Sequence, residues 1–353
     1  MKIVSVVGTR PNFIKEVLVN RRLRELGIPE ILVHAGQHYD SDMSDVFFDQ
    51  LHIPEPNYRL TMASATHAGQ TAAILTGVEE ILLREKPSVT LVYGDVNTTL
   101  AAALASAKLR IPVAHVESGI RTPARFNPEE INRRLADHLS DLLFANTEGA
   151  AQALFSEGFA PHDVVVSGDV LRDLLDSTVK ALNLEVKRGD YHLATVHRAE
   201  NVDSAERLGE IVRAFVQSGK RILFPVHPRT RARLEAFGLH TVLKEAGNVE
   251  LLPPVGYREF VTLLAGADKV LTDSGGVRRE AYLLGKPVLV LIDICWFPEI
   301  SQVGWKTMVG ADSKAILRAL AEFSPIGERP PIFGDGHAHE RIVDSLIARY
   351  SRP

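Results

Sequence analysis

The chain has 353 residues, 45% hydrophobic and 24% charged, which predicts about two domains of ordinary globular composition. Its net charge of -4 excludes a strongly basic nucleic-acid coat, and its single cysteine, Cys295, excludes an internal disulfide and a cysteine cluster for zinc or iron–sulfur. Since no apolar run reaches the ~18 residues of a membrane span and the N-terminal run stops at Gly8, too early for a signal peptide, we expect a cytoplasmic protein with neither membrane nor nucleic-acid partners.

The first half of the chain alternates short apolar runs with longer helical patterns. Runs at 2–7, 31–34, 89–93, 113–116, 142–145 and 164–167 predict strands. Apolar residues three and four apart predict helices over 13–26, 71–84 and 98–108, and Pro128 followed by two acids predicts another helix start. Because the strand runs are apolar throughout, we expect a parallel sheet with helices on both faces.

The pattern begins again after a polar segment at 187–190. Runs at 192–196, 221–226, 249–252, 269–272 and 287–292 predict strands, and stripes at 205–218, 258–265 and 279–284 predict helices. We therefore expect an α/β protein of two doubly wound, Rossmann-like domains, residues 1–168 and 169–353, joined near 168–190. A last helix, at about 338–350, fits against either domain.

In open α/β sheets a ligand binds outside the carboxyl ends of the strands. With two such domains, we expect the site in the cleft where the two sets of strand ends face each other. The turn Gly8-Thr9-Arg10-Pro11 follows the first strand and suits an anion, through backbone N–H groups and one guanidinium; a solvated arginine is the alternative. The chain contains neither a dinucleotide fingerprint nor a P-loop.

Acidic residues follow the next two predicted strands of this domain. Asp95 comes after 89–93 and Glu117 after 113–116. Acids at neighbouring strand ends raise or split each other's pKa values, which suits general acid–base catalysis; a structural role is the alternative. Glu129 and Glu130 open the helix after Pro128, where helix capping and dipole pairing explain them equally well.

In the second domain, two strands end in histidine with a nearby arginine, at His197-Arg198 and at His227. The segment Ser274-Gly275-Gly276 follows another strand and precedes a helix. This arrangement predicts a phosphate cradle, because it combines free N–H groups, the positive end of the helix dipole and two glycines. Glu280, one turn later, is suited to accept hydrogen bonds from a ribose diol. A tight turn with Ser274 as N-cap is the alternative.

A metal is not expected, although the chain has 13 histidines. The pairs His34 with His38 and His337 with His339 have no obvious third ligand or helical frame.

Taken in order, these motifs resemble the non-hydrolysing UDP-N-acetylglucosamine 2-epimerase family over nearly the whole chain. The resemblance is carried by Gly8-Thr9-Arg10-Pro11, Lys15, Gly36-Gln37-His38, Gly94-Asp95, His115-Val116-Glu117, Gly119, Arg121, Pro128-Glu129-Glu130, Asn132-Arg133, His197-Arg198 and Thr272-Asp273-Ser274-Gly275-Gly276. It implies a glycosyltransferase-B-type fold whose last helix crosses back to the first domain, and a homodimeric enzyme of cell-surface polysaccharide biosynthesis.

The resemblance also implies a reaction. UDP-N-acetylglucosamine and UDP-N-acetylmannosamine are interconverted by eliminating UDP to a 2-acetamidoglucal and adding it back to the other face, with no cofactor or metal. The family's catalytic acids match Asp95, Glu117 and Glu129, and His197 belongs to the catalytic set on the phosphate side. The residues that would bind the UDP-sugar are Arg10, Lys15, Arg198, His227, Ser274, Gly275, Gly276 and Glu280.

The chain departs from the family at two places. The usual Asp-Thr-Thr-Glu-Arg-Pro-Glu loop is replaced over 293–299, where Cys295, Trp296 and Phe297 stand at its centre. In the family this loop lines the sugar and phosphate pocket, so the sugar is left open; packing of Trp296 and Phe297 inside the loop is the alternative. Gly36-Gln37-His38-Tyr39 and His197-Arg198-Ala199-Glu200 each lack an arginine of the family's allosteric site, which predicts weak or absent activation by substrate.

Four other functions remain as alternatives. They are 2-epimerisation of another UDP-2-acetamido sugar such as a diacetamido uronic acid, a hydrolysing epimerase, a glycosyltransferase of the same fold, and a UDP-sugar-binding protein whose site the Trp296 loop blocks. Three carboxylates at the strand ends favour an epimerase over a glycosyltransferase.

Overall fold

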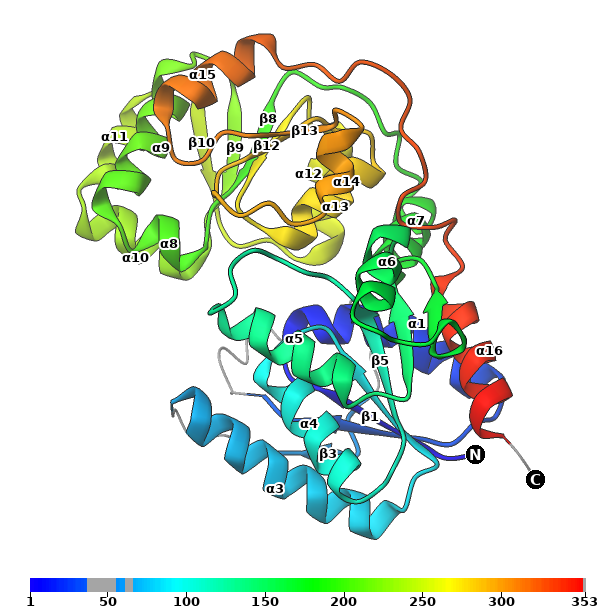
Figure 1. The fold of residues 1–353 in the computed structure, drawn as a ribbon. Coiled ribbons are helices and arrows are strands. Elements are labelled where there is room, and N and C mark those ends of the chain that lie inside the picture. The colour runs from blue at the N-terminus through cyan, green and yellow to red at the C-terminus, as the bar shows by residue number, and fades with distance from the viewer. Residues whose placement is uncertain (37–54, 61–65, 352–353) are drawn as a thin grey trace. The chain divides into compact units, whose positions relative to one another are not determined.

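The computed structural model describes residues 1–36, 55–60 and 66–351. The chain folds into two compact units, the first comprising residues 1–176 and 331–353 and the second residues 177–330 (Figure 1). The chain passes between them within α7 (Val170–Ala181), a little beyond the expected boundary at 168, and again at 330–331.

In the part of the chain that the structure describes, the first unit contains a seven-stranded parallel sheet of order β3-β2-β1-β4-β5-β6-β7. The strands are β1 (Ile3–Val7), β2 (Glu30–His34), β3 (Tyr58–Arg59), β4 (Val89–Tyr93), β5 (Val113–Ser118), β6 (Leu142–Ala145) and β7 (Val164–Val166). All residues of β1 and β4 are buried, as expected for strands covered on both faces.

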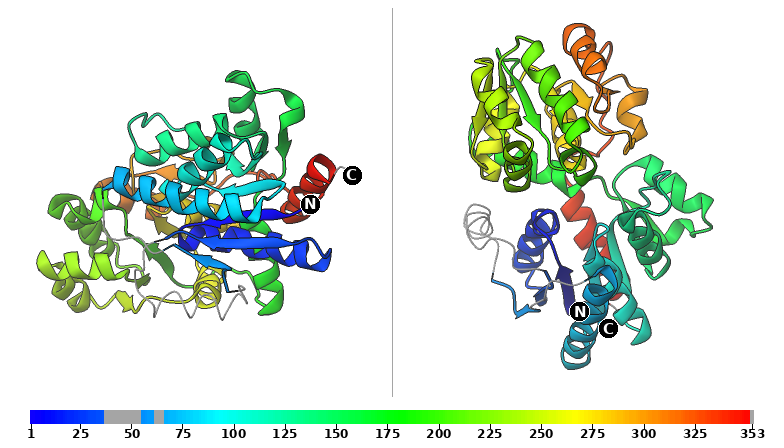
Figure 2. Two further views of the ribbon diagram at one scale, coloured as in Figure 1. Left: turned by 90° about the horizontal axis from the view of Figure 1, so that it is seen from below. Right: turned by 90° about the vertical axis from the view of Figure 1, so that its left-hand side faces the viewer.

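The helices of the first unit bury apolar side chains, except the helix Pro128–His138, which buries mainly polar and charged ones. They are α1 (Arg10–Glu25), α3 (His67–Glu85), α4 (Asn97–Lys108), α5 (Pro128–His138), α6 (Glu148–Ser156), α7 and α16 (Ala338–Tyr350), with a 3-10 turn at Pro161–Asp163. One core joins α3, α4 and α5 to the strands through residues such as Val78, Ala102 and Val92. The last helix, α16, packs against α1 (Figures 1 and 2), and Ser351 Oγ lies 3.6 Å from Met1 Sδ.

The second unit repeats the plan, with a six-stranded parallel sheet of order β10-β9-β8-β11-β12-β13 in the described residues. Its strands are β8 (His192–Thr195), β9 (Ile222–Pro225), β10 (Val249–Leu252), β11 (Val270–Thr272), β12 (Val288–Val290) and β13 (Lys306–Met308). Its helices are α8 (Ala199–Val202), α9 (Ala205–Gln217), α10 (Pro228–Ala236), α11 (Leu239–Glu245), α12 (Tyr257–Gly266), α13 (Gly275–Leu283), α14 (Pro298–Gln302) and α15 (Ser313–Glu322).

The expected fold class, two doubly wound α/β domains each built on a parallel sheet, is confirmed, and three local expectations need correction. Strand β5 extends to Ser118, so Glu117 lies inside the strand and not after it; the register with β6 shifts at this point, where Glu117 has a φ of 70°. Helix α13 begins at Gly275, four residues before the predicted stripe, because Ser274 caps it. The strand β13 is not predicted, because Lys306 and Thr307 interrupt its apolar pattern.

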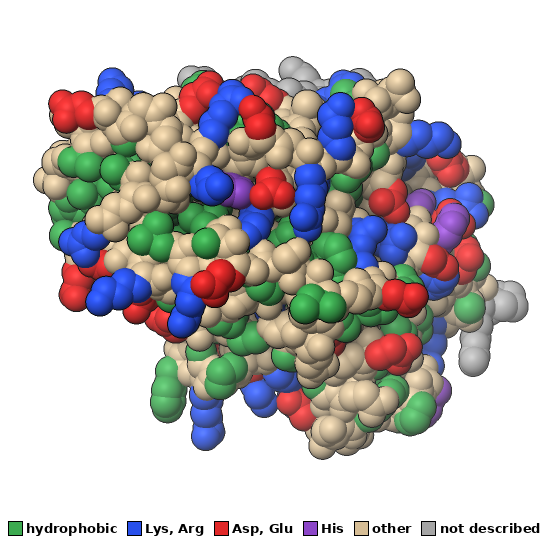
Figure 3. Space-filling view, turned by 90° about the horizontal axis from the view of Figure 1, so that it is seen from above, with side chains coloured by type: hydrophobic (Ala, Val, Ile, Leu, Met, Phe, Trp, Pro, Cys, Tyr) green, Lys and Arg blue, Asp and Glu red, His purple; other side chains and the backbone are tan. Residues whose placement is uncertain are grey.

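On the face drawn in Figure 3, acidic and basic side chains are interspersed, and neither sign forms a separate patch. This agrees with the small net charge of -4. Among the described helices, none combines the length and apolar character that a membrane span requires.

Candidate active site

The first carboxylate of the candidate site, Glu117, is held by a cation from a different strand–helix unit. The ammonium of Lys15, on α1, forms an ion pair with the Glu117 carboxylate, and each side chain is 10% exposed. Since few residues other than glycine adopt a φ near 70° without cost, the bulge in β5 holds Glu117 in an unfavourable backbone conformation, and strain of this kind is common at functional sites.

The turn after β4 brings backbone close to this ion pair. Gly94 has a φ of 69°, and a Cβ atom there would lie 3.3 Å from Lys15 Nζ and 3.4 Å from Asn12 Nδ2. The Asn12 amide donates to the Tyr93 carbonyl at 3.1 Å, while its oxygen accepts from the backbone N–H of Gly8 at 3.3 Å. Asn12 therefore ties the first strand–helix turn to the end of β4.

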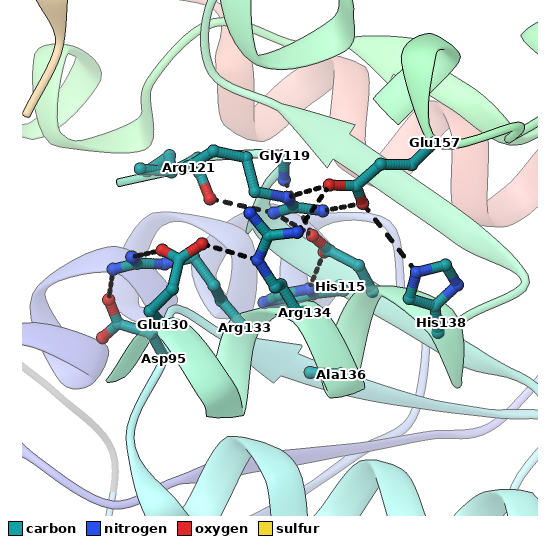
Figure 4. Close-up of polar contacts among 12 residues, drawn as sticks. Asp95, His115, Gly119, Arg121, Glu130, Arg133, Arg134, Ala136, His138 and Glu157 are labelled. Atoms are coloured by element: carbon teal, nitrogen blue, oxygen red, sulfur yellow. Dashed lines mark hydrogen bonds and ion pairs between the residues drawn. The ribbon is translucent and has the colours of Figure 1, made fainter. Parts of the chain in front are cut away.

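The second carboxylate, Asp95, pairs with an arginine on α5 (Figure 4). Arg133 Nη2 donates to Asp95, and Arg133 Nη1 donates to Glu130 Oε2 at 2.6 Å. Although burial lowers the pKa of Arg133, the charges and hydrogen bonds of these two carboxylates raise it above its ordinary value. Asp95 remains 34% exposed, whereas Arg133 is buried. The guanidinium thus orients Asp95 and leaves it accessible to solvent.

The two acids at the start of α5, Glu129 and Glu130, differ in burial and in hydrogen bonding. Asn127 caps the helix by accepting from the Glu129 N–H at 3.3 Å. The Glu129 side chain is half-buried, and no hydrogen bond or ion pair joins it to another described residue. Glu130 is fully buried and accepts from Thr122 and Arg133. Asn127, and not one of the two acids, therefore caps the helix. Glu130 holds the loop before the helix. Glu129 remains available for a role in catalysis.

In the second unit, a buried aspartate organises the segment after β8. Asp273 accepts from the backbone N–H of His197 at 3.1 Å and of Arg198 at 2.9 Å. His197 Nδ1 lies 3.7 Å from Asp273 Oδ1, and the His197 ring lies 5.9 Å from that of His227. Burial lowers the pKa of His197; Asp273 opposes this, while the charges of Arg198 and Arg229 add to it.

The predicted phosphate cradle is the start of α13. Ser274 is the N-cap, since its Oγ accepts from the Val277 N–H at 3.5 Å. The first N–H groups of a helix have no partner within the helix and lie at the positive end of its dipole. Beside Gly276 a Cβ atom would meet only Ser274 Oγ, 4.0 Å away, so the backbone is open to an anion. Glu280, one turn later, is buried.

The loop that departs from the family packs beneath this helix start. Trp296 and Phe297 are each 7% exposed, which confirms the packing alternative. A Cβ atom at Gly275 would lie 3.1 Å from Trp296 Cε3. The guanidinium carbons of Arg198 and Arg278 lie 4.5 and 4.9 Å from the centre of the Trp296 ring. Trp296 therefore supports both the cradle and Arg198.

A buried lysine explains how this loop keeps its shape. Phe297 has a φ of 54°, and Lys306 on β13 donates to the carbonyls of Trp296 and Phe297, the latter at 2.8 Å. Burial lowers the pKa of Lys306 to about 8. Burial and the nearby Arg198 likewise lower the pKa of Arg278 to about 10.

Two predicted features lie outside the described structure. The side chain of Arg10 is not described, and Gln37, His38 and Tyr39 fall in the segment 37–54. Within the residues that are described, no group of three or more histidines, cysteines or acids is placed to hold a metal ion.

Lys15 and Arg133 belong to the motifs named above, but only the structure shows that they pair with Glu117 and Asp95. Asn12 and Asp273 bind backbone groups that are distant in sequence, and Lys306 binds the carbonyls of the loop nine and ten residues before it. No local pattern marks such contacts. The exception is Arg133, whose place three residues after Glu130 on one helix face is a visible signal for an ion pair.

Comparison with known proteins places the chain among sugar-nucleotide epimerases. The model of the family described as UDP-N-acetylglucosamine 2-epimerase matches residues 21–347. The UDP-N-acetylglucosamine 2-epimerase homolog of Methanococcus maripaludis is 45% identical, covering 98% of this chain and 99% of that protein. The UDP-2,3-diacetamido-2,3-dideoxy-D-glucuronate 2-epimerase of Pseudomonas aeruginosa is 40% identical, with the same two coverages.

A solved structure is also similar to this chain over nearly its full length. The crystal structure of the Methanocaldococcus jannaschii UDP-GlcNAc 2-epimerase in complex with UDP-GlcNAc and UDP matches with a TM-score of 0.91 at 40% identity, covering 99% of this chain and 100% of that one.

Proposed function

Because the chain belongs to the UDP-N-acetylglucosamine 2-epimerase family, we propose that it interconverts UDP-N-acetylglucosamine and UDP-N-acetylmannosamine without net hydrolysis. The observation that carries the proposal is the pair of carboxylates at neighbouring strand ends, Glu117 with Lys15 and Asp95 with Arg133. Inverting a carbon that bears a weakly acidic proton requires groups that take a proton from one face and return it to the other.

In the proposed reaction, a carboxylate among Asp95, Glu117 and Glu129 removes the proton from C2. The C1–O bond to UDP breaks with its electron pair leaving on UDP, and a C1=C2 double bond forms. A proton is then returned to the opposite face of C2 while the UDP oxygen re-forms its bond to C1. Atoms and electrons balance, so the reaction consumes no oxidant or reductant.

The departing UDP gains negative charge, which groups of the second unit are suited to stabilise. We assign the diphosphate to His197, Arg198 and the first N–H groups of α13, with Ser274, Gly275 and Gly276 at its start. His227 would complete this surface and Glu280 would accept from the ribose hydroxyls. Arg10 is proposed as a further diphosphate ligand, from its motif alone. Lys15 is assigned to the sugar end of the substrate, because it forms an ion pair with Glu117.

A second candidate substrate is favoured by a specific relative. The Pseudomonas aeruginosa protein at 40% identity is named for a 2,3-diacetamido uronate, and the same C2 chemistry applies to it. The alternative of a non-catalytic UDP-sugar-binding protein assumes that the Trp296 loop blocks the site. Trp296 and Phe297 are buried, which removes this argument. The homodimer, the cytoplasmic location and the polysaccharide pathway remain proposals from family resemblance, and light scattering of the purified chain tests the first of them.

Incubation in deuterated water distinguishes the candidate functions. With UDP-N-acetylglucosamine, we expect deuterium at C2 and a mixture of two UDP-sugars. Free N-acetylmannosamine with UDP as the main product would show a hydrolysing epimerase. Exchange only with the UDP-2,3-diacetamido uronate would assign the second candidate. An absence of exchange with both substrates would refute the proposal.

Substitution of the three acids tests their assignment. Asp95→Asn, Glu117→Gln and Glu129→Gln should each lower kcat by roughly 10²–10⁴-fold, the contribution of a positioned acid or base. Glu148→Gln, at the start of α6, is the matched control, because Glu148 lies in the first turn of another helix in the same unit, as Glu129 does in α5. Wild-type turnover in all three variants would end the assignment.

A further inference from the structure

The first unit contains a chain of alternating charges that begins and ends at one dipeptide, Gly94-Asp95, and Figure 4 shows its members from Asp95 to Arg121. Its members, in order of contact, are Asp95, Arg133, Glu130, Arg134, Glu157, Arg121, Asp137 and His115. The last of them, His115, returns to the carbonyl of Gly94. The two residues of the dipeptide are therefore held from opposite ends of one network.

The middle of the network consists of arginine–carboxylate contacts between α5, the end of α6 and the loop after β5. Arg134 bridges Glu130 at 2.7 Å and Glu157 at 3.2 Å. Arg121 donates to both oxygens of Glu157, at 2.6 and 2.7 Å, and pairs with Asp137 at 2.8 Å. Bidentate arginine–carboxylate pairs fix orientation as well as distance.

His115 closes the network from within β5, and both of its ring nitrogens face acceptors. Nδ1 lies 2.7 Å from Asp137 Oδ1, and Nε2 lies 2.7 Å from the Gly94 carbonyl. Although burial raises the pKa of Asp137, the hydrogen bonds and charges of His115 and Arg121 hold it below its ordinary value. A carboxylate and a carbonyl can only accept, so each ring nitrogen must carry a proton. The histidine is thus an imidazolium, which gives the network four cations and four anions.

The pair of His115 and Asp137 contacts the backbone just after two neighbouring strands, β4 and β5. Through Nε2, His115 holds the carbonyl of Gly94, directly before Asp95. Through Oδ2, Asp137 accepts from the Gly119 N–H at 3.1 Å, two residues after Glu117. His115 and Asp137 are both fully buried, so neither is placed to contact a substrate. Their influence on the carboxylates runs through the backbone.

We propose that His115 and Asp137 are positioning residues: a buried imidazolium–carboxylate pair that sets the relative placement of the Asp95 and Glu117 carboxylates. The proposal rests on the proposed function for the reaction that these carboxylates perform. A displacement of ~1 Å in a reacting group can lower a rate by about 10²-fold. Since UDP is assigned to the second unit, loss of the pair lowers kcat and leaves KM nearly unchanged.

Two substitutions at His115 separate its two contacts. His115→Gln retains an amide N–H near the position of Nε2, so it can still donate to Gly94 but not hold Asp137 equally well. His115→Asn retains one near Nδ1, so it can donate to Asp137 but does not reach Gly94. We expect His115→Asn to lower kcat by about 10–100-fold with KM within about twofold, and His115→Gln to lose less.

The control is another buried histidine beside an aspartate. His192, in the second unit, has Nδ1 3.6 Å from Asp268. His192→Asn should lower the midpoint of thermal unfolding but leave kcat within twofold. Should His115→Asn fail to fold, Asp137→Asn replaces it, with the same expected loss of kcat. Folded variants at both positions that retain wild-type kcat, or that change KM alone, would overturn the proposal.

A measurement without turnover tests the pair by itself. Nitrogen NMR of ¹⁵N-histidine-labelled protein at pH 7.5, with His115 assigned by its absence in His115→Gln, should show both ring nitrogens protonated. A neutral ring would overturn the imidazolium pair whatever the activity. A wild-type chain that exchanges no C2 proton with either UDP-sugar would instead refute the proposed function, so the two failures are distinguishable.

Discussion

The ammonium of Lys15 pairs with the carboxylate of Glu117, although α1 and β5 lie far apart in the chain. β1 and β5 flank β4 in the sheet, so the turn after β1 and the end of β5 meet above Gly94. The contact places a cation beside a proposed catalytic acid and holds its orientation.

Loss of this cation should slow the reaction. Lys15→Met removes the ammonium that pairs with the Glu117 carboxylate, and we expect kcat to fall by roughly 10–100-fold through misorientation, with partial recovery in Lys15→Arg. Lys2→Met is the matched control, because Lys2 also pairs with a glutamate of the first unit, Glu85, at 3.1 Å. Initial rates on UDP-N-acetylglucosamine check this, and equal losses in the two methionine variants would contradict it.

Trp296 should matter for binding UDP. Its ring lies against Arg198 and against the start of α13, and a cation–π contact contributes about 0.5–2 kcal/mol. We expect Trp296→Leu to weaken UDP binding by roughly 3–30-fold and Trp296→Phe to weaken it less, as measured by calorimetry. Trp305→Leu, which removes a tryptophan stacked instead on Arg329, should leave UDP affinity unchanged; a loss as large as that of Trp296→Leu would contradict the role.

Glu16 makes stability depend on pH. Its carboxyl is fully buried beside that of Glu30, and burial and then the charge of Glu30 raise its pKa well above the ordinary value, against the charge of Arg24. A group whose pKa is raised by folding favours the folded state at low pH, and this contribution is lost as pH rises through the raised pKa. The midpoint temperature of thermal unfolding should therefore decrease as the pH is raised from about 5 to about 8.

Glu16→Gln should reduce this fall, because the amide carries no charge at either pH. We expect the variant to be more stable than the wild type at pH 8, by about 1–3 kcal/mol, with the difference shrinking toward pH 5. Glu25→Gln, on the exposed side of the same helix, is the control. Parallel midpoint-against-pH curves for the wild type and Glu16→Gln would contradict the assignment.

Activation by substrate should be weak or absent. The segments 36–39 and 197–200 lack the arginines that the family's allosteric site uses. We expect initial rate to depend linearly on UDP-N-acetylglucosamine at low concentration. A sigmoidal dependence would show that the site persists without these arginines.

Much of the fold follows from the sequence because its signals are local. Runs such as 89–93 are apolar throughout and become buried strands of a parallel sheet, and helical stripes lie between them. The positions of Asp95 and Ser274 follow from the same pattern, since residues after parallel strands collect at one edge of a sheet. The boundary at Glu117 does not follow, because a bulge depends on the register with the neighbouring strand.

The sequence alone determined which chemical groups this protein offers: acids and a lysine on the first domain, and histidines, an arginine and a glycine-rich helix start on the second. Only the tertiary structure decided what holds them. The pairing of Lys15 with Glu117, the closure of the charge network by His115, and the burial of Trp296 against Gly275 join segments distant in the chain. Such contacts arise from strand order and packing, and no local periodicity records them.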